Sequence, residues 1–144
     1  MHDATEAPCW FCGDNRGSDT PPGGWIYEDT LWRAGHLPHT YGPEGLVVVE
    51  SQRHFLDASN MDDAEAAALG PVLKRVTAAI REVTAAQRVY TWASMVAFPH
   101  MHLWLMPWLP GRPEGAGLIS AAHAFACTPE EALHAADALR RVLA

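Results

Sequence analysis

The segment that most constrains the fold is "FPHMHLWLMPW", residues 98–108, in which two histidines interrupt an apolar run. Successive residues of a β-strand point to opposite faces of a sheet. His100, His102 and Trp104 therefore share one face, and Met101, Leu103 and Leu105 share the other, which we expect to lie in a core. Histidines on one face of a strand lie roughly 6.6 Å apart. This spacing favours a division of labour, with one ring held structurally and the other offered to a substrate.

Other runs predict further strands and turns. "WIYEDTLWRAG" reads as a hairpin, because two short β-rich runs flank Glu28, Asp29 and Thr30. "LVVVE", residues 46–50, is a β-branched run typical of a well-buried strand. "RVYTWASMVAF", residues 88–98, predicts a strand that a tight connection near residues 96–99 joins to the histidine strand.

Two helices are predicted. The first begins near Asn60, where Asp62 and Asp63 supply capping oxygens and favourable charge. Its apolar positions recur every three or four residues and form one buried face: Leu69, Leu73, Val76, Ile80 and Val83. Gly70-Pro71 interrupts this pattern, which predicts a kink or two abutting helices. "TPEEALHAADALRRVLA" predicts the second helix, with Thr128 as N-cap, Pro129 at its first position and Glu131 completing a capping box.

This order of strands and helices predicts an α+β domain with a mostly antiparallel sheet. The 144 residues suit one domain with a single sizeable core. We find no internal repeat and no dividing linker, so we expect a single domain over residues 1–144, of which residues 1–8 form a loose tail.

Charge and cysteine content exclude several classes of partner. The net charge is −7, Lys74 is the only lysine and no basic block is present, so a long nucleic acid is not an expected partner. No apolar run approaches the roughly 20 residues that span a bilayer, and the first residues lack the regions of a signal peptide. Three cysteines fit a reducing compartment better than a disulfide framework. We therefore expect a soluble cytoplasmic protein that acts on a small molecule.

The cysteine pair in "CWFC", Cys9 and Cys12, has two interpretations. A redox pair normally opens a helix, and the Gly/Pro-rich segment after Cys12 argues against that role. A zinc site needs two further ligands, for which His36, His39, His54 and His100 are candidates. His54 stands out because it closes a strand-to-helix turn, "ESQRHF", where it could face the end of the histidine strand.

"PHMHLWLMPW" resembles the signature of the histidine triad (HIT) superfamily, in which three histidines alternate with apolar residues. Three other segments resemble zinc-bearing members of that superfamily in the same order: "CWFC", "YEDTLWRA" and "GPEGLVVVESQRHF". This zinc-bearing branch is related to galactose-1-phosphate uridylyltransferase. The resemblance implies a HIT-like fold with a mostly antiparallel sheet of about five strands, one long helix and a C-terminal helix. It also implies a homodimer formed by the long helix and an edge strand.

The resemblance also implies roles for individual residues. Cys9, Cys12, His54 and His100 would hold a structural Zn²⁺, and a Cys₂His₂ set suits tetrahedral zinc with no open position. His102 corresponds to the nucleophile, which attacks phosphorus and forms a nucleotidyl-histidine intermediate. Its ordinary pKa leaves the neutral ring available at neutral pH.

The sequence departs from the family pattern at three places. Trp104 replaces the third histidine, and its indole donates one hydrogen bond but cannot shuttle a proton. Val96, Ala97 and Phe98 stand where polar residues usually cradle phosphate, and only Ser94 offers a hydroxyl nearby. Trp108 follows Pro107 where arginine is usual.

Three functions follow from these residues. The first is a HIT-type nucleotide hydrolase or nucleotidyl transferase that acts on a nucleoside phosphate, phosphoramidate or dinucleotide, with His102 and Trp104 at the catalytic centre and Ser94 near the substrate. The second is the same scaffold turned to another small-molecule reaction, in a more apolar pocket lined by Trp92, Phe98 and Trp104. The third is a non-catalytic binding domain stabilised by zinc.

Overall fold

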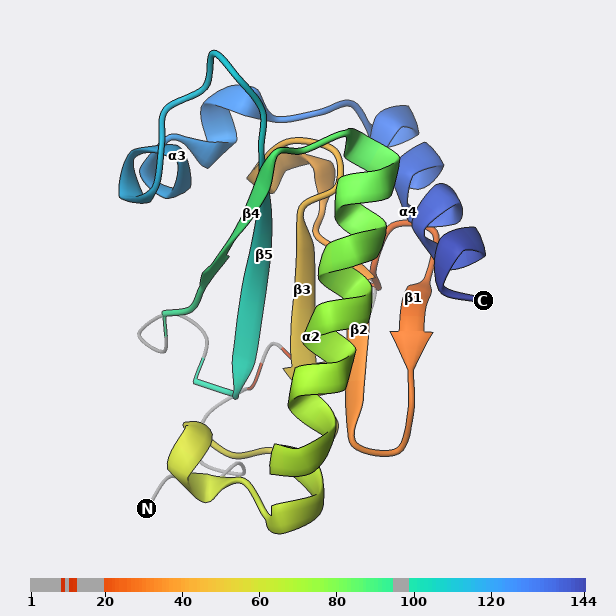
Figure 1. Ribbon diagram of the computed structural model, residues 1–144, viewed down its shortest axis with the longest axis vertical. Coiled ribbons are helices and arrows are strands. Elements are labelled where there is room, and N and C mark those ends of the chain that lie inside the picture. The colour runs from red at the N-terminus through yellow and green to blue at the C-terminus, as the bar shows by residue number, and fades with distance from the viewer. Residues whose placement is uncertain (1–8, 10, 13–19, 95–98) are drawn as a thin grey trace.

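The computed structural model describes residues 9, 11–12, 20–94 and 99–144. Within these residues five strands form one antiparallel sheet in the order β1-β2-β3-β5-β4 (Figure 1). The strands are β1 Trp25–Glu28, β2 Trp32–His36, β3 Val47–Ser51, β4 Arg88–Trp92 and β5 His102–Trp108. The predicted α+β fold with a five-stranded antiparallel sheet is confirmed.

Some strand limits differ from the prediction. The hairpin is confirmed as β1 and β2, whereas β3 begins one residue later than the apolar run and ends at Ser51. The histidine strand begins at His102, so His100 lies in the segment that leads into it. β4 ends at Trp92, which makes it shorter than the predicted strand 88–98. Residues 95–98, with most of the predicted connection, and the predicted tail 1–8 lie outside the described residues.

The long helix α2, Asp63–Thr84, begins slightly later than the predicted start near Asn60, which lies in a separate 3₁₀ turn. Asp62 is the N-cap, and its side chain accepts a hydrogen bond from the Glu65 N–H in a capping box. The expectation of two abutting helices is wrong, because the helix continues through Pro71. Pro71 is exposed, so water can satisfy the carbonyl that its missing N–H leaves unpaired.

Five shorter elements complete the described part of the chain. The C-terminal helix α4, Pro129–Leu143, is capped by Thr128 with Glu131 in the predicted capping box. A short helix, α3 Ala116–Ser120, was not predicted from the sequence. It is followed by the 3₁₀ turn η3, Ala122–Phe125, and another 3₁₀ turn, η1 His39–Tyr41, connects β2 to β3. A further 3₁₀ turn, η2 Ala58–Asn60, precedes α2.

Each face of the sheet carries a different set of side chains. α2 and α4 cover one face, where Val47, Val49 and Leu105 pack against Val76 and Ile80 (Figure 1). The other face bears a second cluster of buried side chains, to which α3 and η3 contribute at one end and residues 9, 11 and 12 at the other. Its buried members are Cys9, Phe11, Leu37, Leu46, Val48, Met106, Trp108, Leu118 and Ala122. We call this second face the histidine face, because His102 and Trp104 project from it.

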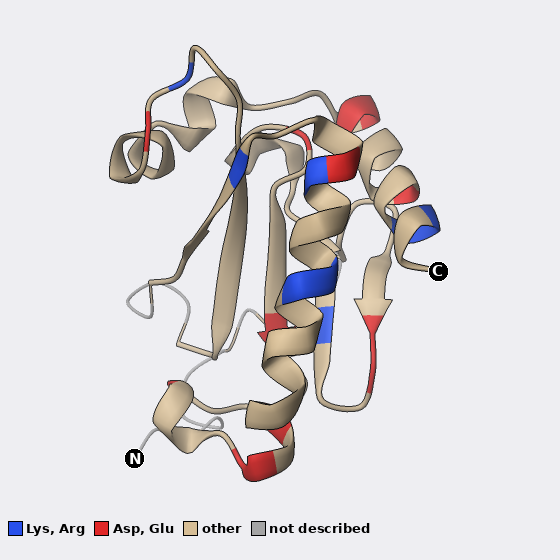
Figure 2. Cartoon of the chain, in the orientation of Figure 1, with Lys and Arg blue, Asp and Glu red and all other residues tan. Residues whose placement is uncertain are grey.

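Charged side chains are spread thinly over the described part of the chain. Figure 2 shows acidic residues at the start of α2 and a few scattered lysine and arginine residues. None of the helices in the described ranges is both long and apolar enough to serve as a membrane span.

The helix-covered core generates a stability prediction. Ile80 is fully buried between α2 and the sheet, so the replacement Ile80→Ala leaves a cavity as well as losing apolar contacts. We expect the free energy of unfolding to fall by about 2–5 kcal/mol. Urea denaturation measures the change. Leu133→Ala on the exposed side of α4 is the control and should change it by less than about 0.5 kcal/mol; equal losses in both variants would contradict the assignment of the core.

Candidate metal centre and catalytic histidine

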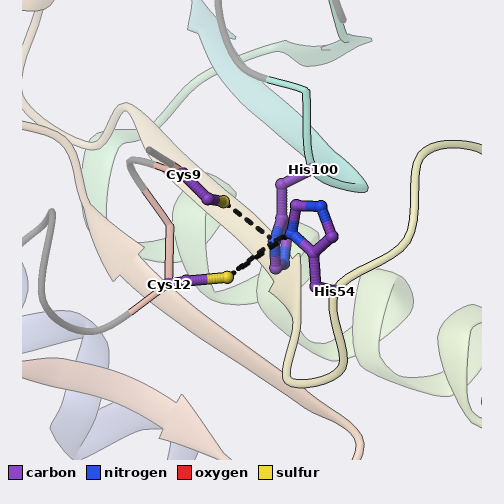
Figure 3. Close-up of side chains that lie close together, drawn as sticks. All are labelled: Cys9, Cys12, His54 and His100. Atoms are coloured by element: carbon purple, nitrogen blue, oxygen red, sulfur yellow. Dashed lines mark hydrogen bonds between the residues drawn. The ribbon is translucent and has the colours of Figure 1, made fainter. Parts of the chain in front are cut away.

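Four side chains from three separate segments meet at one end of the histidine face (Figure 3). Cys9 and Cys12 come from the N-terminal segment, His54 from the turn after β3 and His100 from the segment before β5. Their ligand atoms all lie within 4.8 Å of one another. The structure thus brings together the four residues that the resemblance implies as zinc ligands.

Four of the distances between these atoms approach those around a tetrahedral zinc ion. Nδ1 of His100 lies 3.4 Å from Sγ of Cys9 and 3.7 Å from Sγ of Cys12. Nδ1 of His54 lies 3.4 Å from Sγ of Cys12 and 3.1 Å from Nδ1 of His100. Tetrahedral bonds of about 2.3 Å to sulfur and 2.0 Å to nitrogen place such atoms roughly 3.3–3.8 Å apart. Two thiolates would also neutralise the charge of a Zn²⁺ ion.

Backbone contacts hold the two histidines in place. Nε2–H of His100 donates to the carbonyl oxygen of Ser51 at 2.8 Å, which turns Nδ1 toward the thiols. The Met101 N–H donates to the carbonyl of Phe55 at 2.7 Å, and this bond joins the His54 turn to the His100 segment. A metal-ligating histidine typically has such a partner on its other ring nitrogen, and this hydrogen bond fixes the tautomer of the ring.

Burial also tunes the protonation of the ligands. It lowers the pKa of His100 to about 4, and so keeps the ring neutral and able to donate a lone pair. Burial, together with the neighbouring Cys9 thiol, raises the pKa of Cys12 to about 11. A bound dication reverses this second effect, because thiolates form readily beside it. The cluster is therefore arranged to bind a metal ion with release of thiol protons.

His36 and His39, which the sequence also offered as ligands, do not join the cluster of candidate metal ligands found among the described residues. His36 is buried, and both of its ring nitrogens have backbone partners. Nδ1–H donates to the carbonyl of Leu37 at 2.7 Å, and Nε2 accepts from the Gly45 N–H at 2.8 Å. His36 therefore orders the β2–β3 connection.

His102 occupies the first position of β5 on the histidine face. Nδ1–H donates to the carbonyl oxygen of His100 at 2.6 Å, which leaves the lone pair on Nε2. Burial lowers the pKa of His102, so the ring is neutral at physiological pH. The side chain is only 1% exposed.

The predicted substrate residues have different outcomes. Trp92 and Trp104 are cross-strand partners, and their rings meet edge to face with centroids 5.5 Å apart. Tyr41 also contacts Trp104, with 5.9 Å between the ring centroids. Ser94 follows β4 and is half-buried, whereas Phe98 lies outside the described residues.

Sequence reasoning missed three residues around His102: Phe11 and Glu50, which adjoin it, and Arg33, which contacts Glu50. Glu50 is the cross-strand partner of His102 on β3, and Arg33 is the partner of Glu50 on β2. Glu50 is 0% exposed, and its carboxylate lies 3.7 Å from the Arg33 guanidinium. Phe11 packs over the same region. The sequence did hold a signal for Glu50. It is a carboxylate at the end of the apolar run "LVVVE", on the face opposite to Val49.

The metal centre leads to a direct test. Cys9→Ser removes one of four ligands, so the purified protein should lose about one equivalent of zinc per chain and unfold at a lower temperature. Elemental analysis and thermal unfolding measure the two effects. Cys127→Ser is the matched control, because Cys127 is a free cysteine outside the cluster. Zinc retained in Cys9→Ser, or lost equally in both variants, would contradict the ligand assignment.

No protein-family model matches the sequence, and the curated proteins include no match. Solved structures do resemble it. A zinc-bound histidine triad family protein from Mycobacterium smegmatis is 23% identical, with a TM-score of 0.66 over 94% of this chain and 93% of that one. A histidine triad protein from Bradyrhizobium japonicum is 18% identical, with a TM-score of 0.67 over 95% of this chain and all (100%) of that one.

A uridylyltransferase is 19% identical, with a TM-score of 0.65, and the match covers 97% of this chain but 46% of that protein. These likenesses span almost all of the present chain. They include histidine triad proteins and a uridylyltransferase, the two kinds of protein that the sequence resembles. The chain therefore has the fold of the histidine triad proteins.

Proposed function

We propose that the chain is a HIT-type nucleotide hydrolase or nucleotidyl transferase that works through His102. The observation that carries this proposal is the hydrogen bond from Nδ1–H of His102 to the His100 carbonyl. This bond fixes the tautomer in which Nε2 holds a lone pair. A neutral imidazole in this state is a competent nucleophile toward phosphorus.

The proposed reaction has two steps. Nε2 of His102 forms a bond to phosphorus, while the bond from phosphorus to the leaving group breaks and the leaving group departs with the electron pair and takes a proton from solvent water. Water or another acceptor then displaces His102 from the nucleotidyl-histidine, gives up its own proton to solvent and restores the neutral ring. Cys9, Cys12, His54 and His100 would hold zinc outside these steps, where it ties the N-terminal segment to the sheet. Because His102 is 1% exposed, side chains over it have to move before phosphorus reaches Nε2.

A second candidate function is supported by the aromatic side chains on the histidine face. Trp92 is 36% exposed, and with Trp104 and Tyr41 it forms a continuous aromatic surface on the same face as His102. Planar rings bind such surfaces by stacking. This observation favours an aromatic substrate, either the base of a nucleotide or a different small molecule on a repurposed scaffold.

We also propose that the chain forms a homodimer in a reducing compartment, the cytoplasm. β4 is an edge strand of the sheet, and α2 is the longest helix among the described residues. The resemblance implies that an edge strand and the long helix form the interface. Cys9 and Cys12 are free thiols, the state that metal binding requires and that a reducing compartment maintains.

His102→Ala tests the catalytic proposal. Loss of the nucleophile should reduce turnover of an adenosine phosphoramidate or a dinucleoside polyphosphate by about 10³-fold or more. Product release measured by chromatography gives the rate, and mass spectrometry of the quenched wild-type reaction should find the nucleotidyl group on His102. His123→Ala, at an exposed position, is the control. Turnover unaffected by His102→Ala would overturn the proposal, and nucleotide binding without turnover would support the non-catalytic zinc domain.

Trp92→Ala tests the aromatic surface. Removing the exposed ring should weaken binding of a nucleoside monophosphate by about 1–3 kcal/mol, the usual contribution of one stacked base. Calorimetric titration measures the affinity. Ribose 5-phosphate provides the matched comparison, because it keeps the sugar and phosphate but has no base. Equal losses for both ligands would show that Trp92 acts on the fold and not on a stacked ring.

A further inference from the structure

Phe11 lies between the two metal-binding cysteines in the chain and packs on both histidines of the strand motif. Its ring centroid is 4.7 Å from that of His102, with an interplanar angle of 31°. It is 5.2 Å from that of His100, at 36°. The Phe11 side chain is 1% exposed. One aromatic ring thus contacts both a candidate metal ligand and the candidate nucleophile.

The backbone of Phe11 is held as firmly as its ring. Nη2 of Arg33 donates to the Phe11 carbonyl oxygen at 2.9 Å. The Arg33 guanidinium lies 4.1 Å from the ring centroid of Trp25 and 3.7 Å from the carboxylate of Glu50. Glu50 is in turn the cross-strand partner of His102. Arg33 therefore anchors the Phe11 peptide to the row of the sheet from which His102 projects.

We propose that Phe11 is a positioning residue that couples the metal centre to His102. Metal binding at Cys9 and Cys12 fixes the chain on both sides of Phe11, and Arg33 fixes the carbonyl between them. The ring is then held against one face of the His102 imidazole. The metal acts on the reactivity of His102 through this contact, in addition to stabilising the fold.

The two restraints on His102 are complementary. The hydrogen bond to the His100 carbonyl restrains one edge of the imidazole, and the Phe11 ring restrains its plane. Together they set the direction of the Nε2 lone pair. A nucleophile has to be held close to the geometry of attack for efficient reaction. This inference takes the role of His102 from the proposed function, but it concerns the position of the ring and is tested without turnover.

The test compares Phe11→Leu with the wild type, each with and without metal. Diethyl pyrocarbonate is the probe, because it modifies accessible imidazole nitrogens, and peptide mass spectrometry gives the rate at His102. We expect Phe11→Leu to keep its zinc and to raise the rate about two- to tenfold, the factor that one aromatic contact provides. Metal removal should raise the wild-type rate by a similar factor. In Phe11→Leu it should raise the rate little further, because the effects of two coupled changes are not additive.

Internal controls separate this coupling from loss of structure. His36 is buried with both ring nitrogens bonded, so its protection in the same sample reports an intact fold. Phe125→Leu is the matched variant: it makes the same change in the same apolar cluster, and its rate should equal that of the wild type. The proposal would be overturned if metal-loaded Phe11→Leu reacted at the wild-type rate. It would also be overturned if metal removal raised the rate at His102 by the same factor in Phe11→Leu as in the wild type. An equal increase in Phe125→Leu would have the same consequence.

A second measurement decides the case in which metal removal also exposes His36. The ring nitrogens of His102 are then compared by ¹⁵N NMR in the metal-loaded wild type and Phe11→Leu. We expect a single Nδ1–H tautomer in the wild type and a mixture at His102 in the variant, because a ring that is free to rotate no longer keeps its hydrogen bond to the His100 carbonyl. The nitrogens of His36 should stay unchanged in the variant, whereas general destabilisation of the fold would alter both rings. Identical nitrogen shifts in the two proteins would refute the role of Phe11. Loss of turnover in His102→Ala is a separate result, so failure of the proposed function remains distinguishable.

Discussion

The antiparallel pairing of β3 with β5 is the constraint on which the rest of the site depends. Its register sets Glu50 opposite His102 and Val48 opposite Trp104. It also brings the carbonyl of Ser51 to Nε2 of His100. A slip of one residue would turn every side chain of β5 to the other face, so that His102 entered the apolar core beneath α2. Burial of Val47, Val49 and Leu105 on the helix side prevents this slip.

The cluster of Cys9, Cys12, His54 and His100 adds a second constraint that the sheet alone does not provide. A metal ion held there would join positions 9 and 12 to positions 54 and 100 and so would close long loops whose ordering costs entropy. A metal ion that binds only the folded arrangement offsets this cost and stabilises the fold. The same closure places Phe11 over the histidines. Stability and the environment of His102 therefore depend on one set of contacts.

Much of this arrangement could be predicted from local patterns. Alternation along the histidine strand assigned each face correctly, and the capping residues located the starts of α2 and α4. The ligand set came from the resemblance, since nothing local says which distant histidine meets the cysteines. Gly70-Pro71 left open whether one kinked helix or two abutting helices would form, because the outcome depends on whether the proline faces solvent. The contacts of Phe11 with His102 and of Arg33 with Glu50 depend on tertiary register, which no short pattern encodes.

The histidine face divides into a polar end and an aromatic end, and this division separates the candidate functions. At the polar end Arg33 already contacts Glu50 and the Phe11 carbonyl, so its charge is largely engaged within the protein. Toward the aromatic end Trp104 meets Trp92 and Tyr41, and its indole cannot supply the proton transfer of a histidine. A nucleotide would place its phosphorus at His102 and draw binding energy from its base. A substrate without phosphate would use the aromatic surface alone, and His102 would then have no electrophilic phosphorus to attack. The nature of the group that reaches Nε2 of His102 therefore decides between the two functions.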